Sequence, residues 1–94
     1  MIERQGRSLR VAGPIIMSNA HDVLESGLRL LAAGVEEIDF SQVREADSSA
    51  LVVLLEWLRE AGRRKLQARA VNLPEPMKSL AALYGVHELL ASLR

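Results

Sequence analysis

The sequence contains no cysteine, and its 94 residues include only three aromatic side chains. Without thiols, neither a disulfide framework nor a thiolate-bound metal site can form. Lysine and arginine together number 12, as do aspartate and glutamate, so the formal net charge at pH 7 is zero. Proteins that neutralise nucleic-acid phosphates carry a surplus of cations. This balance therefore argues against nucleic acid as the main ligand.

The chain also lacks a long hydrophobic run. Its longest nearly apolar stretch, residues 50–58, contains Glu56 and is far shorter than the roughly 20 residues that cross a bilayer. The first ten residues are charged and contain no apolar core of a signal peptide. Because 49% of the residues are hydrophobic, the chain can still bury a core. We expect one cytoplasmic domain spanning residues 1–94.

Hydrophobic spacing predicts alternating strands and helices. The predicted strands are residues 1–4, 8–15, 35–40 and 66–71, with a loop at 41–46. The predicted helices are residues 18–34, 48–61, 74–84 and 87–93. Strands that alternate with helices predict an α/β fold in which parallel strand pairs are covered by helices.

Small residues mark the expected helix ends. Ser18 or Asn19 can cap the first helix, and Gly34 and Gly62 are expected to close the first and second. Gly27 lies inside a predicted helix, where glycine costs about 1 kcal/mol relative to alanine. We therefore expect Gly27 to mark a close approach to a neighbouring element.

The second predicted helix is apolar on nearly every side, so we expect it to be buried against the sheet and against a further helix or a partner. Trp57 in this helix and Tyr84 in the next are both expected in the core. An exposed Trp57 would instead be a candidate anchor for a protein interface.

Asp47, Ser48 and Ser49 stand at the start of this helix. Three roles compete for them: capping of the helix, a catalytic serine, and a site of reversible phosphorylation or partner contact. A helix N-terminus offers free N–H groups and a partial positive charge, which suit either a capping oxygen or a phosphate. Spacing alone favours capping, which contributes about 1 kcal/mol.

A serine hydrolase would have to combine Ser48 with His21 or His87 and with Asp39 or Asp47. The sequence has no Gly-x-Ser-x-Gly elbow, no glycine-rich oxyanion loop and no P-loop. No histidine or carboxylate pair has the spacing of metal ligands. We therefore expect no enzyme, no catalytic residue, no cofactor and no metal.

One cluster of basic residues follows the second helix. It can be a solvated helix end, where cations complement the dipole, or a contact for an acidic partner or an anionic membrane surface. Its members are Arg59, Arg63, Arg64, Lys65 and Arg69.

Two segments resemble a known family. The first segment is Ile38-Asp39-Phe40-Ser41, then Val43, then Ala46-Asp47-Ser48-Ser49-Ala50-Leu51. It resembles the signature of STAS domains, which are found in anti-sigma factor antagonists and in some transporters. The family often has glycine at the position of Ala50. The second segment is Leu80-Ala81-Ala82-Leu83-Tyr84, followed by Gly85-Val86 and Leu89. It resembles the C-terminal helix of the small STAS subunit of the bacterial Mla system. That system is an ABC transporter that maintains outer-membrane lipid asymmetry.

The resemblance implies a STAS-like mixed sheet of about four strands, with three to four helices mainly on one side. It implies a non-catalytic accessory subunit that binds the cytoplasmic ATPase of a Mla-type phospholipid transporter. Such a subunit would be cytoplasmic, would reach the inner membrane only through its partner, and would not insert into it. The alternative is an anti-sigma factor antagonist that binds an anti-sigma factor kinase and is regulated by phosphorylation of Ser48. The implied contact residues are Asp47, Ser48, Ser49 and Ala50, with Trp57 as a further interface candidate.

We expect the purified protein to show no hydrolase or ATPase turnover, because the sequence lacks a nucleophile elbow, metal ligands and a P-loop. Assays of ester hydrolysis and of phosphate release from ATP test this. Turnover that co-purifies with the protein and disappears in Ser48→Ala would contradict it.

Overall fold

The computed structural model of the chain describes residues 1–85, which contain four strands and three helices. The strands are β1 (Ile2–Gln5), β2 (Ser8–Ala12), β3 (Glu37–Gln42) and β4 (Arg69–Val71). The helices are α1 (Ala20–Leu30), α2 (Ser48–Arg63) and α3 (Glu75–Leu83). The helix predicted at residues 87–93 lies outside the described residues.

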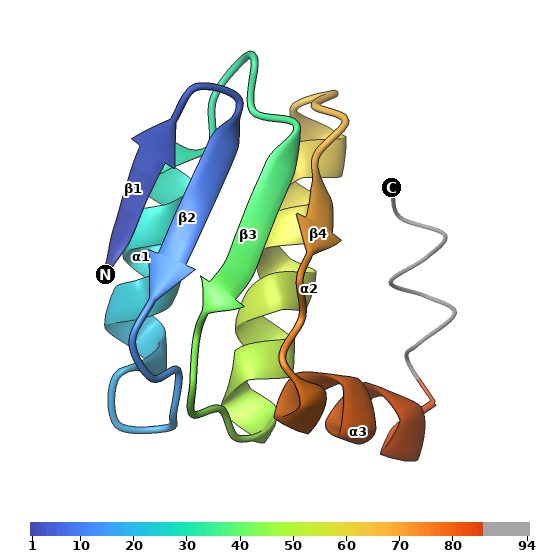
Figure 1. The fold of residues 1–94 in the computed structure, drawn as a ribbon. Coiled ribbons are helices and arrows are strands. Elements are labelled where there is room, and N and C mark those ends of the chain that lie inside the picture. The colour runs from blue at the N-terminus through green and yellow to red at the C-terminus, as the bar shows by residue number, and fades with distance from the viewer. Residues whose placement is uncertain (86–94) are drawn as a thin grey trace.

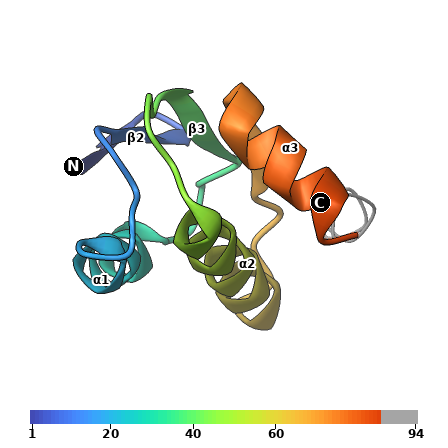
Figure 2. The same cartoon turned by 90° about the horizontal axis from the view of Figure 1, so that it is seen from below.

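The four strands form one mixed sheet in the order β1-β2-β3-β4. β1 pairs with β2 in antiparallel fashion, whereas β2–β3 and β3–β4 are parallel pairs (Figure 1). Figure 2 shows α1 and α2 side by side on the same face of the sheet, with α3 beyond α2. The predicted four-stranded mixed sheet with its helices mainly on one side is confirmed.

Alternation along the strands decides which face the helices cover. Leu9 and Val11 of β2, and Ile38 and Phe40 of β3, are buried between the sheet and the helices. Their neighbours point to the opposite face, because side chains alternate along a strand. That face carries charged residues in cross-strand register, such as Arg10 beside Asp39 and Arg69 beside Glu37.

Gly27 of α1 and Trp57 of α2 are in tight contact. A side-chain carbon added at Gly27 would overlap the indole ring of Trp57. The indole Nε1 donates a hydrogen bond of 3.0 Å to the carbonyl of Leu24, which fixes the ring in this position. On its other side the ring packs on Phe40 of β3, with ring centroids 6.2 Å apart. The predicted close approach at Gly27 is confirmed.

The predicted ends of α1 are wrong in detail. α1 begins after Asn19, but the Asn19 side chain does not cap it. Instead, Asn19 accepts a hydrogen bond from Ile16 N and donates one to Pro14 O, which closes the preceding turn. At the other end, α1 stops at Leu30, and Gly34 lies in the loop before β3.

The predicted end of α2 is also wrong. Gly62 lies inside the helix, and the left-handed residue that ends it is Lys65, with φ of 61°. Lys65 N donates to Gly62 O at 3.0 Å, and Leu66 N donates to Ala61 O at 2.8 Å. These two bonds form a Schellman motif, in which contact between Leu66 and Ala61 supports a non-glycine residue.

Three strand limits differ from the predictions. β2 ends at Ala12 after a register shift. Gly13 N still donates to Gln42 O at 3.2 Å, but Pro14 has no N–H with which to continue the ladder. Ile15 rejoins the sheet through an isolated bridge to Ala46. β3 extends to Gln42, into the predicted loop, and β4 is limited to Arg69–Val71.

We expect Gly27→Ala to destabilise the protein. Overpacking against a fixed indole costs roughly 1–3 kcal/mol, and the gain in helix propensity, about 1 kcal/mol, offsets only part of it. The matched control is Gly62→Ala, which lies in α2 with open space around it and should stabilise by about 0.4–1 kcal/mol. Urea unfolding measures both. Equal effects of the two substitutions would show that the Gly27–Trp57 contact is not tight.

Candidate functional site

The candidate site lies at the carboxyl ends of β2 and β3, where the loops leading to α1 and α2 meet. Backbone hydrogen bonds hold these loops together, from Ile15 N to Glu45 O at 2.9 Å and from Asp47 N to Ile15 O at 3.2 Å. In open α/β sheets the carboxyl ends of parallel strands are the usual binding edge. The fold therefore brings the predicted Asp47-Ser48-Ser49 segment to that edge.

Asp47 is the N-cap of α2 and also ties the two loops together. Its Oδ1 accepts hydrogen bonds from Ser49 N at 2.9 Å and from the Ser49 hydroxyl. Its Oδ2 accepts a hydrogen bond from Met17 N, in the loop before α1, at 3.0 Å. The bonds from Ser49 and from the Met17 backbone hold the pKa of the Asp47 carboxyl below its usual value near 3.8. Asp47 thus has the geometry of a helix cap.

Ser48 and Ser49 have different environments. The hydroxyl of Ser49 is engaged by Asp47, whereas Ser48 is exposed and its hydroxyl makes no hydrogen bond within residues 1–85. Ala50 is fully buried in the core, so its side chain cannot meet a partner as the resemblance implied. Of the four predicted contact residues, Ser48 is the one left free to react or to bind.

A shallow apolar groove of about 440 Å³ lies beside Ser48. Exposed hydrophobic side chains contribute to it from three elements: Met17 before α1, Val52 on α2 and Tyr84 at the end of α3. The remaining lining residues are Ser48, Ser49, Leu51 and Leu55. The sequence analysis did not predict this groove. The one related pattern was the presence of apolar residues on nearly all sides of the second helix, which indicated that this helix also contacts a further helix or a partner.

Comparison with known proteins decides the family. The family model described as "Mlab, STAS domain" matches residues 1–91 of the chain. The chain is a STAS domain. No protein with a curated description matches the sequence closely.

Several solved structures are similar in fold. The anti-sigma factor antagonist SpoIIAA in its unphosphorylated form has a TM-score of 0.61 and 17% sequence identity, over 85% of this chain and 78% of that one. Two crystal structures of Mglu have TM-scores of 0.57 and 0.56, with 20% and 16% identity over 80% and 78% of this chain. This chain spans only 19% and 22% of the Mglu chains. At such identities the likeness shows the fold alone.

Of the two aromatic residues expected in the core of this STAS domain, Trp57 is buried and Tyr84 is not. Trp57 is only 2% exposed, so it is a core residue and not an interface anchor. Tyr84, expected in the core, is 57% exposed and lines the groove. The reason is the notch at Gly27, which gives Trp57 a buried place with a hydrogen-bond acceptor.

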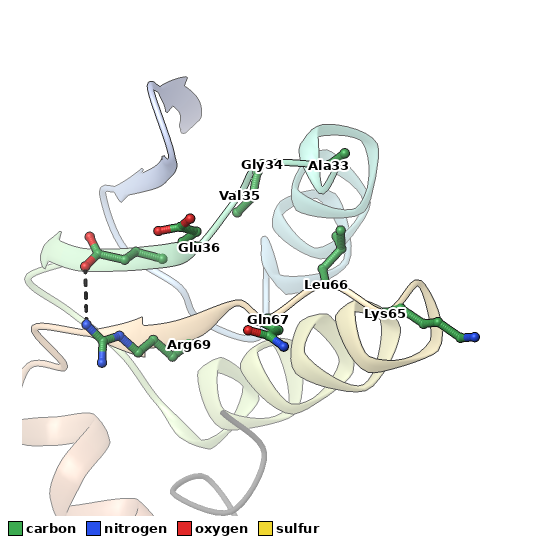
Figure 3. Close-up of a pocket in the computed structure, with 9 residues that line it drawn as sticks. Ala33, Gly34, Val35, Glu36, Lys65, Leu66, Gln67 and Arg69 are labelled. Carbon is green, nitrogen blue, oxygen red and sulfur yellow. Dashed lines mark ion pairs between the residues drawn. The ribbon is translucent and has the colours of Figure 1, made fainter.

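A second cavity, of about 520 Å³, opens at the opposite end of the sheet, where the parallel strands begin (Figure 3). Charged side chains from two loops line it, but Arg69 is paired with Glu37 at 3.8 Å and Glu36 with Arg7 at 3.1 Å. Lys65 points away from it (Figure 3). Although this cavity is larger, it contains no free nucleophile or convergent set of unpaired charges within residues 1–85, so the groove beside Ser48 is the better candidate.

The basic cluster is largely neutralised within the domain. Glu60 accepts hydrogen bonds from both Arg63 and Arg64, and these bonds hold the pKa of Glu60 below its usual value. Arg59 pairs with Glu56 at 3.0 Å. This pairing favours the solvated helix end over a surface for an acidic partner or a membrane.

The described residues do not assemble a catalytic triad. Asp47 is engaged with Ser49 and Met17, and Asp39 accepts hydrogen bonds from Ser41 N and Asn72 on the open face of the sheet. Residues 1–85 contain no cluster of three or more potential metal ligands. None of the helices described here is long and apolar enough to cross a membrane. STAS domains are generally binding or regulatory domains, and the geometry shows nothing catalytic in this part of the chain.

We expect Asp47→Asn to destabilise the protein at neutral pH. If the amide oxygen of the new side chain keeps the bonds from Ser49, its NH2 group lies opposite Met17 N–H, so that two donors meet and one hydrogen bond is lost. Folding lowers the pKa of Asp47. The ionised carboxylate therefore stabilises the fold at pH values above the pKa of the unfolded chain, and this stabilisation is lost as the pH falls through the lower pKa of the folded protein. The stability difference between wild type and Asp47→Asn should therefore be present at roughly pH 6 and shrink by roughly pH 3.

Urea unfolding at several pH values measures this difference. Glu45→Gln is the matched control, because it removes one charge from the same loop without touching these bonds. A difference for Asp47→Asn that does not change with pH would show that the charge of Asp47 plays no part.

Proposed function

We propose that this STAS domain is a non-catalytic accessory subunit that binds the cytoplasmic ATPase of a Mla-type phospholipid ABC transporter. The observation that carries the proposal is the position of Ser48, an exposed residue at a helix start whose hydroxyl makes no hydrogen bond within residues 1–85, directly beside an exposed apolar groove. The match to the "Mlab, STAS domain" family supports the choice of partner.

The groove has the character of a protein-docking surface. Met17 is 78% exposed and Val52 59% exposed, although both are large and hydrophobic. Together with Leu55 and Tyr84 they form one patch rather than isolated exposed residues. Contiguous apolar patches on small domains mark interaction sites, because burying them in a complex removes apolar area from water.

Ser48 gives this docking surface a position that is sensitive to charge. Ser48 begins α2, so a partner that covers Val52 and Leu55 must also pass over the Ser48 hydroxyl. A neutral hydroxyl there can accept or donate a hydrogen bond across the interface. A phosphate would bring nearly two negative charges beside Asp47, and part of its effect would be offset by the helix N-terminus.

The second candidate is an anti-sigma factor antagonist regulated by phosphorylation. The exposure of Ser48 favours it, because a phosphoacceptor must be accessible, whereas the Ser49 hydroxyl is engaged by Asp47. The fold likeness to unphosphorylated SpoIIAA is compatible with either candidate. Both candidates use the same surface of a cytoplasmic protein, and they differ in the partner that docks there.

We expect Ser48→Ala and Ser48→Thr to retain affinity for the Mla-type ATPase within about threefold, and Ser48→Glu to lose more than about tenfold. Alanine removes only a hydroxyl that is free within residues 1–85, and threonine keeps it. Glutamate places a second carboxylate beside Asp47 at the interface. The helix dipole offsets roughly 0.3–1 kcal/mol, less than the cost of a desolvated like-charge contact.

Isothermal titration calorimetry with the ATPase subunit measures these affinities, and circular dichroism confirms that each variant is folded. The control is Gln67→Glu, which adds the same charge at the opposite end of the sheet. If folded Ser48→Glu binds as tightly as wild type, this loop is not the docking surface. If the ATPase does not bind at all while an anti-sigma factor kinase does, the second candidate is correct.

A further inference from the structure

Methionine supplies all the sulfur atoms of this chain. The sequence contains no cysteine and three methionines, Met1, Met17 and Met77. Cysteine thiolates and methionine thioethers are the side-chain sulfurs that peroxides oxidise. Without a thiol to compete, a peroxide that reaches this protein finds only thioether sulfur. How far each methionine is exposed then decides where the oxidation takes place.

The three methionines differ in exposure and in place. Met77 of α3 is fully buried in the core, whereas Met1 is 85% exposed and Met17 78% exposed. Met17 lines the groove beside Ser48, and Met1 lines a different and smaller cavity beside β1 and α1. Met17 is therefore both open to a small oxidant and part of the docking surface proposed above.

The backbone around Met17 is held by hydrogen bonds, so its side chain meets water from a fixed point. Met17 N donates to Asp47 Oδ2 at 3.0 Å. The preceding residue, Ile16, is bonded to Asn19 twice, through its N–H at 2.9 Å and through its carbonyl at 3.0 Å. The exposure of Met17 is thus a property of the fold. An unbranched thioether suits such a place, because it adapts to the shape of a partner.

We propose that Met17 is a site of reversible oxidation, at which a peroxide makes the groove polar. The peroxide transfers one oxygen atom to the Met17 sulfur: its O–O bond breaks, an S–O bond forms, and the remainder leaves as water or an alcohol. The sulfur loses two electrons, which reduce the peroxide. Methionine sulfoxide reductases reverse the step with a dithiol, which becomes a disulfide while the sulfoxide oxygen leaves as water.

Oxidation changes what the groove offers to a partner. A sulfoxide places a polar S–O group where the thioether was, in a groove lined also by the apolar side chains of Leu51, Val52 and Leu55. Water solvates this group in the free domain, but a docked partner would remove the water, and burying a polar group without a hydrogen bond is unfavourable. The oxidised domain should therefore dock more weakly. This last step rests on the proposed function, because it takes the ATPase as the partner.

The first experiment locates the oxidation in the full-length protein without a partner. Hydrogen peroxide is added for increasing times, catalase stops the reaction, and mass spectrometry of peptides gives the oxidised fraction at each methionine. We expect Met17 to be oxidised at least about tenfold faster than Met77, with Met1 as the matched exposed thioether outside the groove. Oxidation of Met17 no faster than that of Met77 would overturn the proposal.

An apolar dye, anilinonaphthalene sulfonate, reports the character of the groove without a partner. We expect oxidation of wild type to lower the dye fluorescence at least about twofold, and methionine sulfoxide reductases of both stereospecificities to restore it. The control is Met17→Leu, which is apolar and has no sulfur at this position, so peroxide should leave its fluorescence unchanged although Met1 is still oxidised. An equal loss in Met17→Leu, or no loss in wild type, would contradict the proposed change of the groove.

Binding of the ATPase separates this inference from the proposed function. By calorimetry, oxidised wild type should bind at least about tenfold more weakly than before oxidation and recover after reductase treatment. For Met17→Leu, the affinities before and after peroxide should agree within about twofold. Equal affinity of oxidised and unoxidised wild type, or the same loss in Met17→Leu, would show that Met17 does not control docking. If unoxidised wild type fails to bind the ATPase, the proposed function is wrong, whereas the oxidation rates and the dye still decide whether Met17 is the site.

Discussion

The indole of Trp57 determines how the two long helices lie on the sheet. Its ring fills the space left by Gly27, its N–H is bonded to Leu24 O, and its other side rests on Phe40 of the central strand β3. One side chain thus joins α1, α2 and the sheet. A hydrogen-bonded ring in a glycine notch leaves little freedom, because protein interiors are close-packed. The approach of α1 to α2 follows from this contact.

The candidate site is a consequence of that arrangement. With α1 and α2 fixed, the loops that lead into them meet at the end of the sheet, and Asp47 joins them by accepting from both Met17 and Ser49. In the sequence, capping and binding compete as roles for Asp47, Ser48 and Ser49. In the structure, different residues of this segment suit the different roles. Asp47 caps the helix start and engages the Ser49 hydroxyl, whereas the Ser48 hydroxyl makes no hydrogen bond within residues 1–85. The same geometry places Met17 at the groove.

Sequence patterns predicted the alternation of strands and helices, the close approach at Gly27 and the start of α2 after Asp47, because each depends on local spacing or on one residue type. They could not predict which aromatic is buried. Both Trp57 and Tyr84 were expected in the core. Trp57 is buried because a notch on another helix receives it, which is a long-range property, whereas Tyr84 is exposed at the end of α3. They also placed the end of α2 at Gly62, whereas Lys65 adopts the left-handed conformation. There Leu66 packs against a buried cluster that includes residues distant in sequence, such as Leu9 and Leu31. The groove was missed because it joins three segments distant in sequence.

The face of the sheet that α1 and α2 leave uncovered has a consequence for assembly. Arg10 lies 3.9 Å from Asp39 and Arg69 3.8 Å from Glu37, each on a neighbouring strand. Charges compensated by their cross-strand neighbours remain stable in water and offer an incoming protein little apolar area to bury. Within residues 1–85 the exposed apolar groove and this charged face of the sheet therefore lie on different sides of the domain. A partner that docks in the groove would leave the paired charges of the sheet in water.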